Sequence, residues 1–392
     1  MEEVIIVKYG ELMLKGKNRP FFLNTLIKNI KETLTTAGNF KIEKGQSILY
    51  LKPGKDANIE KAMTLLPDVF GVLVYHRALK IDKDVDQIKE KCVTYFTEKL
   101  EQSGTFKLET RRADKDFPLK SQEINTVVGE HVAGSFAHLK VDVHNPDTTI
   151  FINIRKDGIY LYSEKYKGPG GLPVGTGGKA TVLLSGGIDS PLAAWLIARR
   201  GVALDAVHFY SYPYTSERSK NKVIELTKQL AKYTGKLRLY VFPFTEIQEA
   251  IIENCPKEQV TIIMRRQMMR VAEMLSRKHG SQALITGESI GQVASQTMEG
   301  LTVTNSAVDI PVFRPLIGMD KEEIVDSTRG IGTYNISIQP YTDCCTIFVP
   351  KHPQTKPKLE EIEQSEKKVD FQELIMKGLQ GIEAINAEPE YY

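Results

Sequence analysis

The chain has few cysteines and no long apolar run. Four cysteines among 392 residues are too few for a disulfide framework, and no C-x-x-C pair indicates a structural zinc site. No apolar stretch approaches the roughly 18 residues needed to span a bilayer. The acidic start MEEVIIVKYGE is unlike a secretion signal. The sequence therefore predicts a protein of the reducing cytoplasm, with no membrane segment and no bound metal of its own.

The net charge is small but unevenly distributed. It is +3 for the whole chain, and residues 360–392 contain nine acidic and three basic residues, so residues 1–359 carry +9. A basic body favours a polyanionic partner, because neutralised phosphates release counterions. A solvated basic surface would give the same count, so charge alone leaves the two interpretations open.

The first 165 residues mix short strands with helices. The apolar patterns predict strands at 4–9, 47–51, 71–81, 105–109, 140–144 and 149–156, and helices at 20–36, 58–66, 84–103 and 122–135. This order predicts two small α+β modules. Residues 168–180, GPGGLPVGTGGKA, contain six glycines and two prolines, which indicates a linker or a functional loop.

The pattern changes after the glycine-rich junction. Strands expected at 181–184, 204–210, 237–242 and 283–286 alternate with helices expected at 191–200, 216–233 and 259–279. Nearly continuous apolar strands separated by helices predict a parallel sheet covered on both faces, and hence an α/β domain. The acidic C-terminal stretch is expected to be a helix or a partly ordered tail.

The string SGGIDS follows the first of these strands directly. Its two glycines allow a sharp turn, and the following helix start, with Ser190 as expected N-cap, offers N–H groups to a phosphate. The hydroxyls of Ser185 and Ser190 can bind pyrophosphate oxygens, and Asp189 can hold Mg²⁺ or orient the loop. A plain glycine turn is the alternative, but the complete string favours a nucleotide loop. The spacing of a Walker A loop and the Rossmann fingerprint are both missing.

Three later segments are expected to complete the nucleotide pocket. His208 and Phe209 end the second strand, Arg265 lies on the long helix, and Gly287 leaves a strand in ITGESIGQVASQT. Each has an ordinary alternative. His208 could be a core histidine, and Arg265, with its neighbours Arg266 and Arg270, could form a solvated helix face.

Together these motifs resemble known families. SGGIDS resembles the loop of the PP-loop ATP pyrophosphatases, which transfer AMP to a substrate oxygen. With VKYGELMLKGKNRPFF, FKLETRRADKDFPLKSQEI, VDVHNPD and YTDCCTIFVPKHP, nearly the whole chain resembles the tRNA 4-thiouridine synthetase family, ThiI, in its short form without a rhodanese domain. The resemblance implies a ferredoxin-like domain at 1–58, an RNA-binding THUMP domain at 59–166, the junction at 167–180 and a PP-loop domain at 181–392.

The resemblance also implies a reaction and its partners. ATP, with Mg²⁺, would adenylate O4 of uridine 8 in tRNA, and a persulfide sulfur would displace AMP to leave 4-thiouridine. A cysteine desulfurase would donate the sulfur, the thiamine-pathway sulfur carrier protein would be a second acceptor, and a homodimer is possible for the family. The motifs and the loop together assign ATP contacts to Leu183, Leu184, Ser185, Gly186, Gly187, Asp189, Ser190, His208, Phe209, Arg265, Gly287 and Gln296.

A dense basic cluster lies in the segment that resembles the THUMP domain. It consists of Lys107, Arg111, Arg112 and Lys115, and Phe117 follows it. Phosphate contacts from these side chains would position tRNA without reading its sequence. The alternative is a solvated basic loop.

The adjacent Cys344 and Cys345 lie in the loop-like stretch YTDCCTIF. A nucleophilic thiolate must be accessible, as a loop allows, whereas the alternative is that the pair packs into the core. The family pattern matches its essential cysteine to Cys345. We therefore expect Cys345 to accept sulfur directly from a desulfurase, because no cysteine follows it. Cys344 is a weak candidate for a resolving thiol, since a disulfide between adjacent residues is strained. Cys92 is expected in the core.

Other functions fit parts of the sequence. A different PP-loop enzyme could adenylate a small molecule or another tRNA base, although the basic module disfavours a small substrate. A non-catalytic RNA-binding protein would not need the intact SGGIDS loop. A THUMP-containing methyltransferase would need a glycine-rich cofactor motif other than that loop, and we find none.

Overall fold

The computed structural model describes residues 2–341, 347–348, 350 and 353–389. The chain forms two compact units. The N-terminal unit consists of Met1–Arg19 and Ile30–Gly170, and the C-terminal unit consists of Pro20–Asn29 and Gly171–Tyr392. No helix among the described residues is long and apolar enough to cross a membrane.

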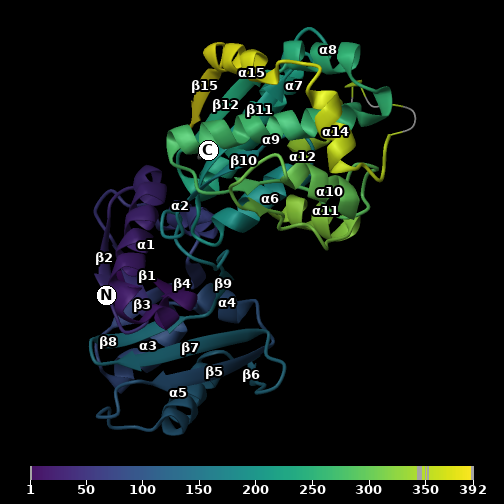
Figure 1. The fold of residues 1–392 in the computed structure, drawn as a ribbon. Helices are drawn as coiled ribbons and strands as arrows, with labels where there is room; N and C mark the ends of the chain where they lie inside the picture. The colour runs from purple at the N-terminus through teal and green to yellow at the C-terminus, as the bar shows by residue number, and fades with distance from the viewer. Residues whose placement is uncertain (1, 342–346, 349, 351–352, 390–392) are drawn as a thin grey trace. The chain divides into compact units, whose positions relative to one another are not determined.

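The N-terminal unit is built on one nine-stranded sheet (Figure 1). The strand order is β2-β3-β1-β4-β8-β7-β5-β6, and β9 pairs with β4. The strands are β1 (Glu2–Tyr9), β2 (Phe40–Lys44), β3 (Ile48–Pro53), β4 (Val72–Ile81), β5 (Thr105–Arg112), β6 (Lys140–Val141), β7 (Thr148–Arg155), β8 (Gly158–Tyr162) and β9 (Tyr166–Lys167). Because β4 pairs with both β1 and β8, the two expected α+β modules share a continuous sheet.

Four α-helices lie wholly within this unit: α2 (Ile59–Leu65), α3 (Val85–Thr94), α4 (Thr97–Glu101) and α5 (Ser121–Ser135), with short 3-10 turns at Glu11–Asn18, Leu34–Ala37 and Leu66–Asp68. Helix α1 (Arg19–Thr33) is divided between the two units, because Pro20–Asn29 belongs to the C-terminal unit. The single helix expected at 84–103 is wrong, because the helix is interrupted between α3 and α4. Phe96 leaves helical geometry with ψ 14° and packs in the core, while the Tyr95 hydroxyl donates to Glu3 Oε1 at 2.6 Å. Cys92 is fully buried in the same core, as expected.

The C-terminal unit contains a six-stranded sheet in the order β14-β13-β10-β11-β12-β15. The strands are β10 (Lys179–Leu183), β11 (Ala203–Tyr210), β12 (Leu237–Pro243), β13 (Leu284–Ile285), β14 (Val312–Phe313) and β15 (Glu383–Ala387). All neighbours are parallel except β12 and β15. Strand β10 has β11 on one side and β13 on the other, so the chain order reverses beside β10. Ligands of open α/β sheets bind at such a reversal.

The helices of this unit are α6 (Asp189–Ala198), α7 (Glu217–Thr234), α8 (Thr245–Asn254), α9 (Val260–His279), α10 (Met298–Asn305), α11 (Lys321–Gly330), α12 (Tyr334–Ser337), α14 (Leu359–Glu366) and α15 (Phe371–Gln380), with a 3-10 turn at Lys257–Gln259. Figure 1 shows α9 crossing the strands of the sheet. Its apolar side, with Ile263 and Leu275, joins Phe242 of β12 and Ile375 of α15 in one core cluster.

The acidic C-terminal stretch is ordered by packing. It forms α14, α15 and then β15, which adds an antiparallel edge strand beside β12. Glu366 at the end of α14 is 7% exposed and binds Arg266 of α9 with a Nε–Oε1 distance of 2.9 Å. The expected helix is therefore confirmed, but no local pattern predicted the strand that follows it.

The glycine-rich junction is not a loose linker. Leu172 N donates to Arg199 O at 2.9 Å, and the N–H groups of Gly175 and Gly177 donate to Gly201 O. Gly171 has φ +76°, and a Cβ there would lie 2.1 Å from Arg199 O. A glycine is required at that position because any side chain would collide with the backbone that ends α6.

Candidate functional site

A cavity of about 280 Å³ lies at the carboxyl ends of β10, β11 and β13. This is the reversal point of the strand order, where a ligand is expected. Its lining residues are Leu183, Leu184, Ser185, Asp189, Ser190, His208, Phe209, Arg265, Met268, Met269, Thr286, Gly287, Glu288, Gln296 and Thr304. Ten of the twelve expected ATP contacts are among them. The remaining two, Gly186 and Gly187, belong to the adjoining loop. The fold thus gathers residues spread over more than a hundred positions of sequence.

The SGGIDS loop is closed by its two serines. Ser185 N donates to Ser190 Oγ at 2.9 Å, and the two hydroxyl oxygens lie 3.1 Å apart. Gly187 N donates to Ser185 Oγ at 3.3 Å. The expectation that Ser190 caps the helix is wrong. Helix α6 already begins at Asp189, with Ile188 as N-cap and no side-chain cap bond. Ser190 instead holds the loop closed, and the helix N-terminus faces the cavity.

Gly287 brings the chain after β13 against the start of α6. A Cβ at this position would lie 2.6 Å from Ser190 N and 2.7 Å from the carbonyl carbon of Asp189. Both are backbone atoms that cannot rotate away. The absence of a side chain therefore lets the two cavity walls meet.

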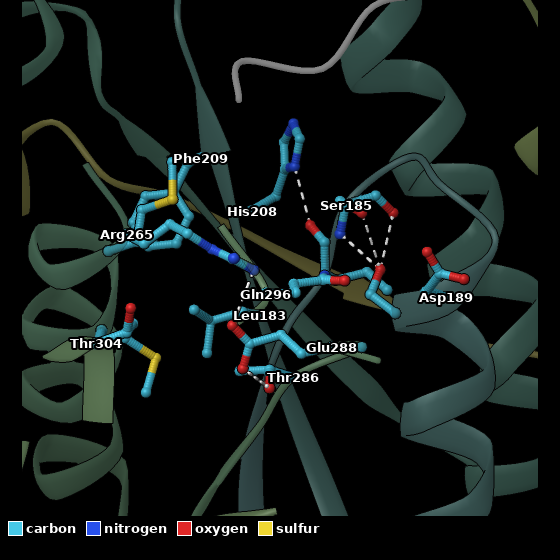
Figure 2. Close-up of a pocket in the computed structure, with 15 residues that line it drawn as sticks. Leu183, Ser185, Asp189, His208, Phe209, Arg265, Thr286, Glu288, Gln296 and Thr304 are labelled. Atoms are coloured by element: carbon cyan, nitrogen blue, oxygen red, sulfur yellow. Dashed lines mark hydrogen bonds and ion pairs between the residues drawn. The ribbon is translucent and has the colours of Figure 1, made fainter. Parts of the chain in front are cut away.

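Asp189 stands at the edge of the cavity, on the opposite side from Arg265 (Figure 2). Its Oδ2 accepts a hydrogen bond from Gln292 Nε2 at 3.1 Å, and Lys321 Nζ lies 3.4 Å from its Oδ1. Among the described residues, no group of three or more His, Cys, Asp or Glu side chains could hold a metal ion. A single carboxylate fits Mg²⁺ that arrives with phosphate oxygens and keeps several water ligands.

Glu288 is a site residue that sequence reasoning missed. It is 3% exposed, and its carboxylate lies 2.9 Å from Arg265 Nη2 and 2.7 Å from Arg314 Nε. Thr286 Oγ1 donates to it at 2.8 Å. Burial alone would raise the pKa of Glu288, but the two arginines outweigh burial and hold the pKa below its usual range. Its position directly after Gly287, three residues beyond β13, is the sequence feature that could have identified Glu288 as a site residue.

Arg265 is thereby fixed in orientation. Its Nη1 donates to Ser295 Oγ at 2.9 Å while Nη2 binds Glu288, and Figure 2 shows the guanidinium directed into the cavity. Arg266, one residue on, is 1% exposed and bonded to Glu366 and to Val303 O at 2.6 Å. A solvated helix face is therefore wrong for Arg266, which anchors the C-terminal segment.

The apolar wall of the cavity is formed by Phe209 and two methionines. Phe209 contacts Phe242 and Phe244, with ring centroids 5.9 and 5.2 Å apart. His208 is 4% exposed, and its Nδ1 lies 3.0 Å from Leu184 O. His208 is both a buried histidine and part of the cavity lining, so the two expectations for it are compatible.

The adjacent Cys344 and Cys345 lie outside the described residues. The chain leading to them is tied to the nucleotide loop, because Ser337 Oγ donates to Gly187 O at 3.2 Å. Lys222 of α7 is 4% exposed and donates to Tyr341 O at 2.8 Å. Both cysteines of the described part of the chain are buried, and burial raises the pKa of the Cys255 thiol. A buried thiol is a poor nucleophile.

The basic cluster expected to bind tRNA lies on β5 and the loop after it. Lys107 Nζ donates to Val143 O at 3.1 Å, and Arg111 forms an ion pair with Glu109. Arg112 Nη1 donates to Phe117 O and Leu119 O at 2.9 and 2.6 Å, so this residue holds the loop. Lys115 is exposed within that loop.

Three family models match the chain. One described as "Thiamine biosynthesis protein (ThiI)" matches residues 175–371, the ThiI ferredoxin-like domain matches 4–75, and the THUMP domain matches 82–164. The chain is 51% identical over 388 residues to a "Probable tRNA sulfurtransferase" of Acetivibrio thermocellus, which covers 98% of this chain and 99% of that protein. A protein with the same description from Caldanaerobacter subterraneus subsp. tengcongensis is 53% identical over 375 residues, covering 96% and 97%.

Two solved structures are similar to the chain. The crystal structure of a 4-thiouridine synthetase–RNA complex with bound ATP matches with a TM-score of 0.91 at 36% identity, over 99% of this chain and 100% of that chain. PH1313 from Pyrococcus horikoshii Ot3 matches with a TM-score of 0.64 at 26% identity, over 84% and 99%. The expected fold is confirmed: ferredoxin-like and THUMP domains precede a PP-loop α/β domain with a mostly parallel sheet.

Proposed function

The chain belongs to the ThiI family of tRNA sulfurtransferases, and from this premise we propose that it uses ATP to convert uridine 8 of tRNA into 4-thiouridine. The observation that carries the proposal is the SGGIDS loop, closed by its two serines at the reversal of a parallel sheet. It borders a cavity lined by the apolar Phe209, Met268 and Met269 and by the fixed Arg265. A purine ring needs the apolar surface, and phosphates need the positive charge.

The first step would be adenylation of the uridine. The O4 oxygen attacks the α-phosphorus of ATP, the bond to the β-phosphate oxygen breaks, and pyrophosphate leaves. The N-terminus of α6 and the loop N–H groups would bind the pyrophosphate, since they supply donors and a positive dipole end. Asp189 would hold the Mg²⁺ that arrives with ATP, and this ion would neutralise phosphate charge. Phe209 and the methionines would contact the adenine.

The second step would be sulfur transfer from a persulfide on Cys345. The terminal sulfur attacks C4, the C4–O4 bond breaks, and AMP leaves with O4. A thiol must then cleave the S–S bond to free 4-thiouridine, and Cys344 or an external thiol can do so. The contact of Ser337 with Gly187 supports this assignment, because it holds the preceding segment beside the nucleotide loop. Lys222 fixes Tyr341 at the end of that segment.

The remaining partners follow from the same assignment. A cysteine desulfurase would load Cys345, and the thiamine-pathway sulfur carrier protein would be a second sulfur acceptor. We place the enzyme in the cytoplasm, where thiols stay reduced, and we retain the proposed domain limits at 58, 166 and 180 and the possible homodimer. Lys107, Arg111, Arg112 and Lys115 are proposed to contact tRNA, although Arg112 also supports its own loop.

One reconstitution tests the proposal. The protein is incubated with ATP, Mg²⁺, unmodified tRNA, cysteine and a desulfurase, and the tRNA is digested to nucleosides for mass spectrometry. We expect 4-thiouridine from wild-type tRNA and none from tRNA carrying cytidine at position 8. Thiolation of a different base would assign another PP-loop reaction. RNA binding without any ATP turnover would instead identify a non-catalytic tRNA-binding protein.

A further inference from the structure

A second cavity of about 280 Å³ lies within the N-terminal unit, where β1 approaches β5 and β7. It is lined by Lys8, Arg111, Arg112, Ala113, Asn153, Ile154 and Arg155. Strands β4 and β8 separate β1 from β7 in the sheet, so the long side chain of Lys8 extends across the face of the sheet toward the other cations. Other side chains of the sheet also reach across intervening strands: Tyr50 of β3 stacks on Tyr160 of β8 with centroids 5.0 Å apart.

The cavity has an excess of positive charge. None of its described lining residues is acidic. The nearby Glu109 is bonded to Arg111, with its Oε1 3.0 Å from Nε and 2.8 Å from Nη2. Lys165, whose Nζ lies 3.4 Å from the centroid of the Phe151 ring, adds to the same field. Burial first, and then Arg111, Lys165 and Arg155, lower the pKa of Lys8. Burial and repulsion by the neighbouring cations therefore disfavour the charged form of Lys8.

The donors of the cavity are incompletely satisfied. Arg155 Nε is buried and has no hydrogen-bond partner among the described residues. A buried donor without a partner costs stability that an acceptor would restore. Arg266, by comparison, has acceptors within the chain: it donates to the carboxylate of Glu366 and to the carbonyl of Val303. Arg155 also forms a hydrogen bond with the Tyr50 hydroxyl, so the contrast indicates that the acceptor still missing for Arg155 Nε comes from outside the chain.

We propose that Lys8, Arg111 and Arg155 bind one backbone phosphate of the tRNA substrate. The proposal rests on the proposed function for the identity of the RNA, but not for the presence of an anion site. A phosphate group offers several acceptors and a negative charge, which matches the forked donors of two guanidiniums and one ammonium. The site would position the RNA without reading its sequence.

The test compares Lys8→Gln and Arg155→Gln with Lys55→Gln, a matched removal of one charge from an exposed lysine of the same unit. Dissociation constants for unmodified tRNA are measured by fluorescence anisotropy over a series of KCl concentrations. Each cavity variant should bind tRNA roughly fivefold to tenfold more weakly at 0.15 M salt and lower the salt slope by about 1. Circular dichroism melting checks that each variant folds.

The outcomes separate this proposal from the proposed function. If both cavity variants match Lys55→Gln in affinity and slope, the phosphate site is refuted even when the wild type thiolates tRNA. If the wild type makes no 4-thiouridine but the cavity variants still lose RNA affinity, the site stands and the function fails. In a further titration, inorganic phosphate is added to the protein–tRNA complex at matched ionic strength. If it binds the cavity without displacing tRNA, the cavity is a site for small anions and the proposal is wrong.

Discussion

Gly287→Ala is the substitution whose effect the structure defines most sharply. The added Cβ would lie 2.6 Å from Ser190 N and 2.7 Å from the carbonyl carbon of Asp189. Ordinary contact begins at 3.4 Å, so the backbone must open by about 0.8 Å. The atoms that must move are the first residues of α6, which border the nucleotide cavity. The substitution therefore tests whether the alignment of this helix start matters for ATP.

The magnitude follows from the size of this displacement. Overpacking of a close contact costs about 1–3 kcal/mol of unfolding free energy. A misplacement of about 1 Å in a reacting site can cost roughly 100-fold in rate. We expect Gly287→Ala to lower kcat/KM for ATP by about that factor, with a clear loss of ATP affinity. The protein should still fold, because a penalty of this size is smaller than the stability of most domains.

Gly318→Ala is the matched control. A Cβ at Gly318 meets nothing within 4 Å, and its φ is not in the left-handed region. ATP binding is measured by isothermal titration calorimetry, thiolation by nucleoside analysis, and stability by urea denaturation. If Gly287→Ala binds ATP and thiolates tRNA as well as Gly318→Ala does, the close approach has no functional role and our description of the site is wrong.

Three further substitutions test other parts of the site. Glu288→Gln removes the charge shared by two arginines and should cost about 3–5 kcal/mol at pH 7 in urea denaturation. Because the pKa of Glu288 is lowered in the folded state, this stabilisation is complete above about pH 5 and is lost as pH falls through the lowered pKa. The gap between wild type and variant should therefore shrink near pH 4, and a constant gap would contradict the charge pairing. Lys222→Met leaves Tyr341 O without its donor, a loss of about 1–3 kcal/mol. It should slow 4-thiouridine formation in a single-turnover assay while calorimetry shows unchanged ATP affinity, and equal loss of both would indicate general unfolding. Cys345→Ser should abolish thiolation in the reconstituted assay, whereas Cys344→Ser should stay active with dithiothreitol present. Full activity of Cys345→Ser would refute its assignment.

Three arginines close together on α9 have different roles because they have different tertiary partners. Arg265 is turned into the cavity by Glu288, whereas Arg266 and Arg270 bind Glu366 and fix the C-terminal segment. The helix positions differ by only a few residues, yet the carboxylates come from different parts of the chain. Sequence alone left all three as either pocket residues or a solvated face.

The sequence by itself determined the features that depend on neighbouring residues. The strand–loop–helix of SGGIDS, the alternation of apolar strands with helices and the glycine-rich junction all arise from local geometry. These patterns predicted the α/β domain, and the family resemblance together with the loop predicted ten residues that line its cavity. The motif order also identified the family, because several short strings in a fixed order are far more specific than any one of them.

Tertiary structure decided what depends on distant partners. Ser190 closes the loop instead of capping the helix, because α6 already begins at Asp189 and the Ser190 hydroxyl accepts a hydrogen bond from Ser185 N. Strand β15 exists because β12 presents an unpaired edge. Lys8 and Arg155 share a cavity because β1 and β7 belong to one sheet, although 146 positions separate them in the sequence. Charge partners and strand edges are set by folding in space, and no local pattern of residues records them.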